Sequence, residues 1–187
     1  WYSWYRNSNR NGRGIITNMK KIYLLFIAIL FTSCSQNQNY LIEEGVVDID
    51  YLKNSPKTYW FNENFKNYTV ETINRDNFSE LYNYDIEVFM NTLCHDSQRE
   101  IPRLIKILKE LNFPEDKLKI ILLNPNKKSE MGYEVNKNIT NTPTIIFNID
   151  NTEINRIVEF PKESLESDIL KILNDEDYKH VYFIEWY

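Results

Sequence analysis

A single cysteine near the middle of the chain is the residue best placed to do chemistry. Cys94 stands in the run VFMNTLCHDSQRE, where the pattern of an apolar strand gives way to that of a helix. A thiol at the start of a helix faces backbone N–H groups that lack helical partners, and the positive end of the helix dipole. Both features stabilise a thiolate, which is the nucleophilic form of cysteine. We therefore expect Cys94 to be partly exposed and reactive.

The residues beside Cys94 bear on this expectation. The hydroxyl of Ser97 comes three residues later, where it can donate a hydrogen bond to the sulfur. A protonated His95 supports the thiolate, whereas Asp96 opposes it. Two plainer interpretations stay open, namely that Cys94 is a buried, inert cysteine and that His95 only faces solvent. The spacing of Cys94, His95, Asp96 and His180 does not match a metal site, so we expect no metal and no cofactor.

A proline at the start of a strand is the second feature with chemical meaning. The run NTPTIIF, from Asn141 to Phe147, has the composition of a strand that opens with Pro143. A cis peptide bond between Thr142 and Pro143 would turn the backbone groups of Thr142 outward, where a bound peptide can reach them. The sequence thus predicts a ledge for an extended chain beside Thr142 and Pro143.

The elements that must position these residues alternate between strand and helix. Pro102 falls inside the helix that follows Cys94 and is expected to remove one of its hydrogen bonds. Asp150 and Asn151 are turn residues between the last two strands, and Ser164 can cap the last helix. The order of elements predicts an α/β fold in which helices cover both faces of a mixed sheet. We expect strands at 84–91, 117–123, 144–149 and 154–160, and helices at 59–73, 97–111, 129–135 and 164–173.

These motifs together resemble the thioredoxin-like superfamily over residues 57–175. Cys94 and Ser97 stand where that family has its Cys-x-x-Cys loop, and Pro102 matches the proline of its active-site helix. Thr142-Pro143-Thr144 matches its cis-proline loop. The ten residues CHDSQREIPR, which begin at Cys94, are similar to those of a bacterial branch of the family. The resemblance implies a thioredoxin-like mixed sheet.

The resemblance also implies what these residues do. Cys94 is the nucleophile that attacks a substrate disulfide. Pro143 shapes the substrate groove, in which the backbone of Thr142 pairs with the substrate chain, and His95 is assigned to the same surface. Ser97 replaces the second cysteine of the family and is assigned to the catalytic site with Cys94. An external thiol must therefore release any adduct formed on Cys94.

Two classes of function follow from these residues. The first is thiol–disulfide exchange through Cys94 alone, with protein or small-molecule thiols and disulfides as partners. The alternative is a non-catalytic module that holds an extended peptide beside Pro143. Whether the protein is an enzyme depends on the reactivity of Cys94 and stays open at this point.

The N-terminal region resembles the signal peptide of bacterial lipoproteins. Met19-Lys20-Lys21 precedes an apolar run, Ile22 to Phe31, that is too short to span a bilayer. Thr32 and Ser33 then lead to Cys34, which in that family is lipidated and begins the mature chain. The alternative is an ordinary thiol after a signal peptide without a lipid. We expect a protein of the bacterial cell envelope, facing the periplasm or the surface and anchored to the membrane through Cys34.

The rest of the chain divides around the expected domain. Residues 1–18 fit no part of a signal peptide and are interpreted as translated upstream sequence, with residues 19–33 as the signal. Residues 34–56 are predicted to be a tether with a short strand at 46–52. The aromatic tail at 176–187 is interpreted as either an edge strand or a mobile end.

Charge and composition exclude several classes of protein. The chain has 22 basic and 27 acidic residues, and its first 33 residues hold five of the basic ones and no acid. The remaining body is therefore acidic and repels phosphate backbones, so we expect no nucleic-acid partner. The chain has four glycines, too few and too scattered to form a glycine-rich phosphate loop.

Overall fold

The structure is a computed structural model that describes residues 44–71 and 73–184. The expected upstream segment, the signal peptide and the lipidation site at Cys34 lie outside the described residues, as does the first part of the expected tether. Among the described residues, every helix is too short or too polar to cross a membrane.

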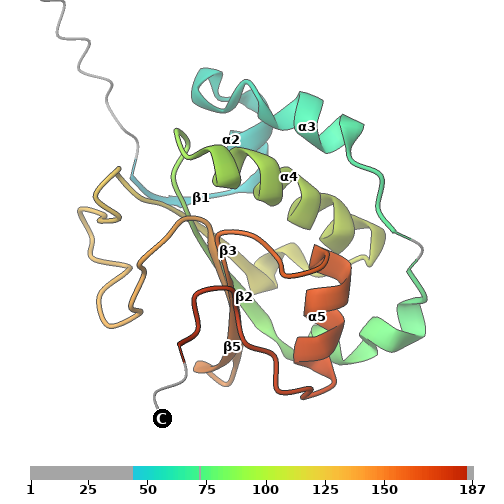
Figure 1. The fold of residues 1–187 in the computed structure, drawn as a ribbon. Helices are drawn as coiled ribbons and strands as arrows, with labels where there is room; N and C mark the ends of the chain where they lie inside the picture. The colour runs from blue at the N-terminus through green and yellow to red at the C-terminus, as the bar shows by residue number, and fades with distance from the viewer. Residues whose placement is uncertain (1–43, 72, 185–187) are drawn as a thin grey trace, which may run out of the picture. The chain divides into compact units, whose positions relative to one another are not determined.

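A five-stranded mixed sheet forms the centre of the described region (Figure 1). Its strands are β1 (Gly45–Val47), β2 (Asp85–Met90), β3 (Leu118–Leu122), β4 (Thr144–Ile149) and β5 (Thr152–Val158). They lie in the order β1–β3–β2–β4–β5, so β2 is the middle strand. β2 pairs in parallel with β3, and the other three pairs are antiparallel. The mixed sheet predicted from the sequence is therefore confirmed.

The α-helices of the described region lie on one face of this sheet (Figure 1). They are α2 (Ile49–Asn54), α3 (Phe61–Asn67), α4 (His95–Glu110) and α5 (Leu165–Leu173), and the 3-10 helices are η1 (Pro56–Thr58), η2 (Arg75–Asn83) and η3 (Glu115–Lys117). Apolar residues of all four α-helices share one buried cluster with Val88 and Ile145. The next residues along those strands, Phe89 and Ile146, point to the opposite face and form a second cluster. The expectation of helices on both faces is therefore wrong for the described residues.

The opposite face is covered by the segment between β3 and β4. The helix expected at 129–135 is not formed, and this stretch consists of turns. Gly132, Asn136 and Asn138 have φ values of 67°, 64° and 51°, which a right-handed helix does not contain. Glycine and asparagine adopt such values most readily, so the composition of the segment favours turns over helix. Tyr133 packs from this segment onto the second cluster.

The folded region begins earlier than the sequence predicts. β1 and α2 lie within the residues assigned to the tether, so the boundary at residue 57 is wrong. Leu52 of α2 is fully buried in the main cluster, and Val46 pairs with Ile121 of β3. Asp48 caps α2 by accepting a hydrogen bond from the N–H of Tyr51 at 2.7 Å. The apolar residues of this stretch therefore complete the sheet and its core.

A proline inside α4 explains a contact between α3 and α4. Pro102 has no N–H, so the carbonyl of Gln98 loses its usual partner within the helix. The side-chain amide of Asn64 in α3 donates to this carbonyl at 2.9 Å. α3 is shorter than the helix expected at 59–73, and Asn64 fixes it along the first half of α4.

The hairpin turn predicted between the last two strands and the cap predicted for the last helix are confirmed. Asp150 and Asn151 form the turn with φ values of 49° and 62°, which is typical of a two-residue hairpin turn. Ser164 caps α5, because its hydroxyl oxygen accepts a hydrogen bond from the N–H of Ser167 at 3.2 Å.

Two tyrosines donate hydrogen bonds to buried carboxylates of α5. Tyr68 donates to Glu166 at 2.9 Å, and Tyr178 donates to Asp168 at 2.7 Å. Burial first and these hydrogen bonds second raise the pKa of both tyrosines well above the usual value. Tyr178 belongs to the expected tail, whose described part forms no strand and packs beside β5, where Asn155 donates to the carbonyl of Tyr178 at 3.0 Å.

Replacing Asn64 is expected to destabilise α4 through the carbonyl of Gln98. Asn64→Ala should lower the free energy of unfolding by about 1–2 kcal/mol, because that carbonyl then lacks a donor. The loss should be smaller in a Pro102→Ala background, where an N–H becomes available within the helix. Urea denaturation of the double-mutant cycle measures the coupling. Asn62→Ala is the control, since Asn62 donates to an exposed carbonyl of Lys53. If the effects of Asn64→Ala and Pro102→Ala simply add, the assignment is contradicted.

Stability is expected to fall as the pH rises above about 10. There the unfolded chain releases the protons of Tyr68 and Tyr178, whereas the folded chain keeps them because their pKa values are raised. Each step upward in pH therefore favours the unfolded state. Urea denaturation at several alkaline pH values measures the slope. Tyr68→Phe and Tyr178→Phe should each make this slope shallower. Val70→Ala is the control and should lower stability by the same amount at each pH. If wild type, Tyr68→Phe and Tyr178→Phe have the same slope, the prediction is contradicted.

Candidate functional site

The pairing of β2 with β4 brings Cys94 and Pro143 to the same end of the sheet. β2 ends at Met90, shortly before Cys94, and β4 begins at Thr144, directly after Pro143. The two strands are antiparallel, and Phe89 lies opposite Thr144. The end of β2 therefore lies beside the start of β4, and the two segments singled out in the sequence meet.

Cys94 is the N-cap residue of α4 and is half-buried. Its Sγ donates a hydrogen bond to the carbonyl oxygen of Thr142 at 3.0 Å, and its own carbonyl accepts from the N–H of Gln98 at 3.0 Å. The Thr142–Pro143 peptide bond is cis. Thr142 and Pro143 are both buried, so the ledge expected beside them is not an open surface in this structure. Cys94 is the part of this contact that solvent reaches.

The hydrogen bond that the structure gives to the hydroxyl of Ser97 goes to the backbone, not to the sulfur. Its side chain is fully buried, and its hydroxyl oxygen accepts a hydrogen bond from the N–H of Asn91 at 3.4 Å. The expectation that Ser97 donates to the sulfur of Cys94 is therefore wrong. The first turn of α4 directs this side chain inward, toward the end of β2, because the inner face of the helix packs on the sheet.

Asn91 is a site residue that its residue type alone does not reveal. Its carbonyl accepts from the N–H of Cys94 at 3.1 Å, and its side-chain oxygen accepts from the N–H of Leu93 at 2.8 Å. Its side-chain amide donates to the carbonyl of Leu123 at 2.7 Å. Asn91 therefore attaches the turn that bears Cys94 to the end of β3. An asparagine directly after a strand is the signal that points to such a turn.

The charged residues at the start of α4 pair with one another. Arg99 contacts Asp96 at 2.7 Å and also contacts Glu100, whose side chain is buried. Burial alone would lower the pKa of Arg99, but hydrogen bonds and charge interactions with Glu100 and Asp96 outweigh it and raise the pKa. His95 is exposed and makes no side-chain hydrogen bond to another described residue. The structure therefore does not join His95 to Thr142 and Pro143.

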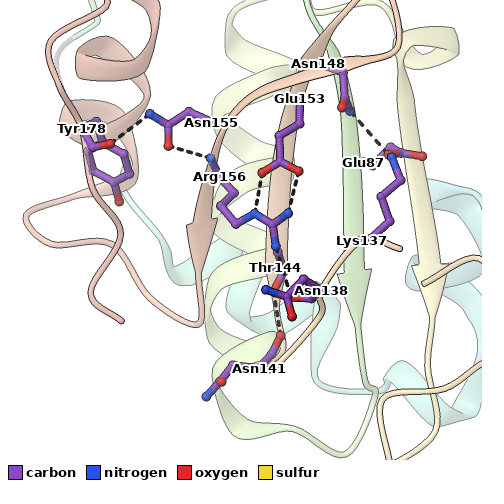
Figure 2. A network of polar contacts seen from close by, with 10 residues as sticks. All are labelled: Glu87, Lys137, Asn138, Asn141, Thr144, Asn148, Glu153, Asn155, Arg156 and Tyr178. Atoms are coloured by element: carbon purple, nitrogen blue, oxygen red, sulfur yellow. Dashed lines mark hydrogen bonds and ion pairs between the residues drawn. The ribbon is translucent and has the colours of Figure 1, made fainter. Parts of the chain in front are cut away.

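The loop before β4 is tied to the sheet by polar contacts (Figure 2). Arg156 of β5 donates to the carbonyl of Asn138 at 3.3 Å. Lys137 pairs with Glu87 of β2 at 2.7 Å. Because these contacts come from two different strands, the loop that carries the acceptor for the Cys94 thiol is fixed in place without a helix.

Metal ligation finds no support in the described residues, which contain no group of three or more His, Cys, Asp or Glu side chains arranged around a common point. His180 lies in the tail, where burial lowers its pKa and the charges of Arg156 and Lys162 lower it further. Its ring packs against that of Phe183, with 6.2 Å between the ring centroids.

Comparison with known proteins gives no family. No family model matches the sequence, and no curated protein matches it. Among solved structures, the fold is similar to that of a protein of unknown function from Pseudomonas aeruginosa, determined by crystallography at 1.5 Å. The TM-score is 0.46 at 11% sequence identity, and the match covers 70% of this chain and 89% of that chain. A likeness at this level assigns neither a family nor a function.

Ser97→Ala separates a structural role of this residue from a chemical one. The substitution leaves the buried N–H of Asn91 without its acceptor, so the free energy of unfolding should fall by about 1–2 kcal/mol. The rate at which iodoacetamide alkylates Cys94 should stay within about twofold of wild type, because the sulfur bonds to Thr142 and the hydroxyl to Asn91. Alkylation followed by mass spectrometry measures this rate. A large change in rate without a loss of stability contradicts the observed geometry.

Proposed function

We propose that this protein is a thioredoxin-like thiol–disulfide exchange protein that acts through Cys94 alone. The position of the sulfur is the observation that carries the proposal. It lies at the N-cap of α4, 3.0 Å from the carbonyl oxygen of Thr142, the residue before Pro143. A half-buried thiol at a helix N-terminus, beside a proline that opens a strand, is the arrangement that the resemblance to the thioredoxin-like superfamily implies.

The order of the elements supports the same proposal. β2, α4 and β3 form a parallel βαβ unit, and the β4–β5 hairpin is followed by α5. This is the sequence of elements that the resemblance implies around Cys94 and Pro143. The turns that replace a helix between β3 and β4 are the departure from it. That departure lies on the face of the sheet opposite the helices, and leaves α4 and its first turn unchanged.

The proposed reaction is an exchange of partners between sulfur atoms. The thiolate of Cys94 attacks one sulfur of a substrate disulfide, a new disulfide forms to Cys94, and the second substrate sulfur leaves with the electron pair and takes a proton. An external thiol then attacks the mixed disulfide, forms a disulfide with the bound group and releases Cys94 as a thiolate. The disulfide content is unchanged over the cycle, so no separate oxidant or reductant is consumed.

The contact between Cys94 and Thr142 must change during this reaction. A carbonyl oxygen accepts a hydrogen bond from a thiol but offers no donor to a thiolate. When the sulfur attacks a substrate, it therefore leaves the carbonyl of Thr142, which becomes free to accept from the backbone of a bound chain. This is the groove role that the resemblance gives to Thr142 and Pro143.

We also propose that the reaction takes place at the bacterial cell envelope, with the chain anchored through a lipid on Cys34. The support is the lipoprotein-like pattern of the sequence, in a segment outside the described residues. Disulfides persist in such an oxidising compartment, so substrates for exchange are available there.

A non-catalytic peptide-binding module is the second candidate, and the position of Ser97 favours it. Ser97 is fully buried and its hydroxyl oxygen accepts from the N–H of Asn91, so its observed hydrogen bond does not assist exchange at the sulfur. In this alternative the surface beside Pro143 holds a peptide, and Cys94 contributes only a hydrogen bond to Thr142.

Reaction with an aromatic disulfide tests the proposal. The purified full chain, reduced beforehand, is mixed with 5,5′-dithiobis(2-nitrobenzoate), and the released thiolate is followed by absorbance. Cys94 should react about tenfold faster than the cysteine of an unstructured peptide, and added glutathione should release the adduct. Cys94→Ser identifies the share of the signal due to this residue. A rate at or below that of the peptide overturns the exchange reaction and favours the peptide-binding module.

Ser97→Cys gives a second readout of the same chemistry. Position 97 lies in the first turn of α4, three residues after Cys94, so a thiol there comes within reach of a mixed disulfide on Cys94 once that sulfur has left Thr142, and the adduct should decay without added glutathione. Asn91→Ala in the same background should slow this decay, because Asn91 positions the turn that carries Cys94. An adduct on Ser97→Cys that is as long-lived as on wild type counts against attack within the helix.

A further inference from the structure

Glu159 connects the loop of Pro143 to the C-terminal tail. It directly follows β5, and its N–H donates to the carbonyl of Pro143 at 2.7 Å. Its carboxylate accepts from the side-chain amide of Asn141 at 3.2 Å and from the hydroxyl of Tyr182. The side chain of Glu159 therefore links the tail to the loop that contacts Cys94. In the sequence, almost ninety residues separate Tyr182 from that cysteine.

The hydroxyl of Tyr182 is also sensitive to a charge in the first turn of α4. Its pKa is raised by the hydrogen bond to Glu159 above all, and also by the negative charge of Asp96. Figure 1 shows the tail, in dark red, returning from the end of α5 past β5. Tyr182 is thus linked through Glu159 to the loop whose Thr142 accepts a hydrogen bond from the thiol.

Three large apolar side chains around this site are exposed to solvent. Leu93 is 61% exposed, Phe160 38% and Tyr182 45%. Leu93 precedes Cys94, and Phe160 follows Glu159. The rings of Phe160 and Tyr182 meet edge to face, with 6.3 Å between their centroids. Exposed apolar side chains next to the residues of a polar site are typical of a surface that binds another chain.

The carboxylates of this surface already have partners. Asp96 pairs with Arg99 at 2.7 Å, and Glu159 accepts from Asn141 and Tyr182. Their charges are therefore partly compensated within the protein. A neutral, apolar segment complements this surface better than a small ionic thiol does, because it buries the exposed rings without adding charge.

We propose that Tyr182 determines which substrates reach Cys94, by forming one wall of a surface for an extended peptide with apolar residues on both sides of its cysteine. This inference rests on the proposed thiol chemistry. Leu93 contacts the residues on one side of the substrate cysteine, and Phe160 and Tyr182 contact those on the other. Glu159 is a positioning residue, because it holds Tyr182 against the loop of Pro143.

Peptide binding tests this assignment without any redox step. The probe is a fluorescein-labelled decapeptide with a central serine flanked by leucine and phenylalanine, and its partner probe carries serine at the flanking positions. Fluorescence anisotropy with the full chain should show binding of the apolar probe, weakened about fivefold or more by Tyr182→Ala. Tyr182→Phe keeps the ring but loses the bond to Glu159, and should weaken binding about twofold.

Phe183→Ala is the matched control. Phe183 is a neighbouring aromatic of the tail whose ring contacts His180 and the ammonium of Lys179 rather than Glu159, so binding should be unchanged. Glu159→Gln tests the same wall without removing a ring and should weaken binding as Tyr182→Phe does. Thermal unfolding of each variant shows whether the fold is retained. Equal binding by wild type, Tyr182→Ala and Phe183→Ala, or equal binding of the two probes, overturns the assignment.

The outcome for Tyr182 can be told apart from the outcome for the reaction. If Cys94 exchanges with the aromatic disulfide but Tyr182→Ala binds the apolar probe as wild type does, the role of Tyr182 fails and the reaction stands. If Tyr182→Ala weakens binding but Cys94 does not exchange, the surface stands and belongs to the peptide-binding module.

Discussion

The antiparallel pairing of β4 with β2 is the constraint on which the candidate site depends. Because Thr144 lies opposite Phe89, the first residues of β4 are held beside the last residues of β2. The turn after β2 carries Cys94, and the loop before β4 carries Thr142, so the register alone brings the thiol to its acceptor. A shift of the register by one residue would turn every side chain of β4 to the other face and separate the two segments.

The buried carboxylates of α5 accept hydrogen bonds from groups outside that helix. Asp168 is fully buried and accepts from Tyr178 and from the N–H groups of Lys162 and Glu163. A buried carboxylate without donors is costly, so these contacts fix the start of α5 to the tail that follows it. The tail is thus a part of the fold, and its contact with Glu159 extends that fold to the edge of the site.

The sequence predicted the parts of the structure in which one periodic signal dominates. The four strands from β2 to β5, the helix after Cys94, the hairpin turn at Asp150 and the cap at Ser164 follow from apolar spacing and from turn or cap chemistry. The direction of Ser97 did not follow, because it depends on how the first turn of α4 packs against the end of β2. The role of Asn91, and the contact of Tyr182 with Glu159, depend on which distant segments the sheet brings together. The covering of only one face by helices was missed because the apolar residues from 129 to 135 fit a helix, while the positive φ values at Gly132 and Asn136 do not.

The turn-rich segment between β3 and β4 gives the sheet a thin outer layer. Tyr133 and Ile139 are the partly buried apolar residues by which it packs on the second cluster, while Met131 and Val135 are 76% and 58% exposed. Chain inserted near Met131 would therefore displace little buried surface, and the cost of closing a longer loop grows only slowly with its length. This stretch is the natural place to graft a fluorophore or an affinity tag, far along the chain from the thiol and on the face that the helices leave open.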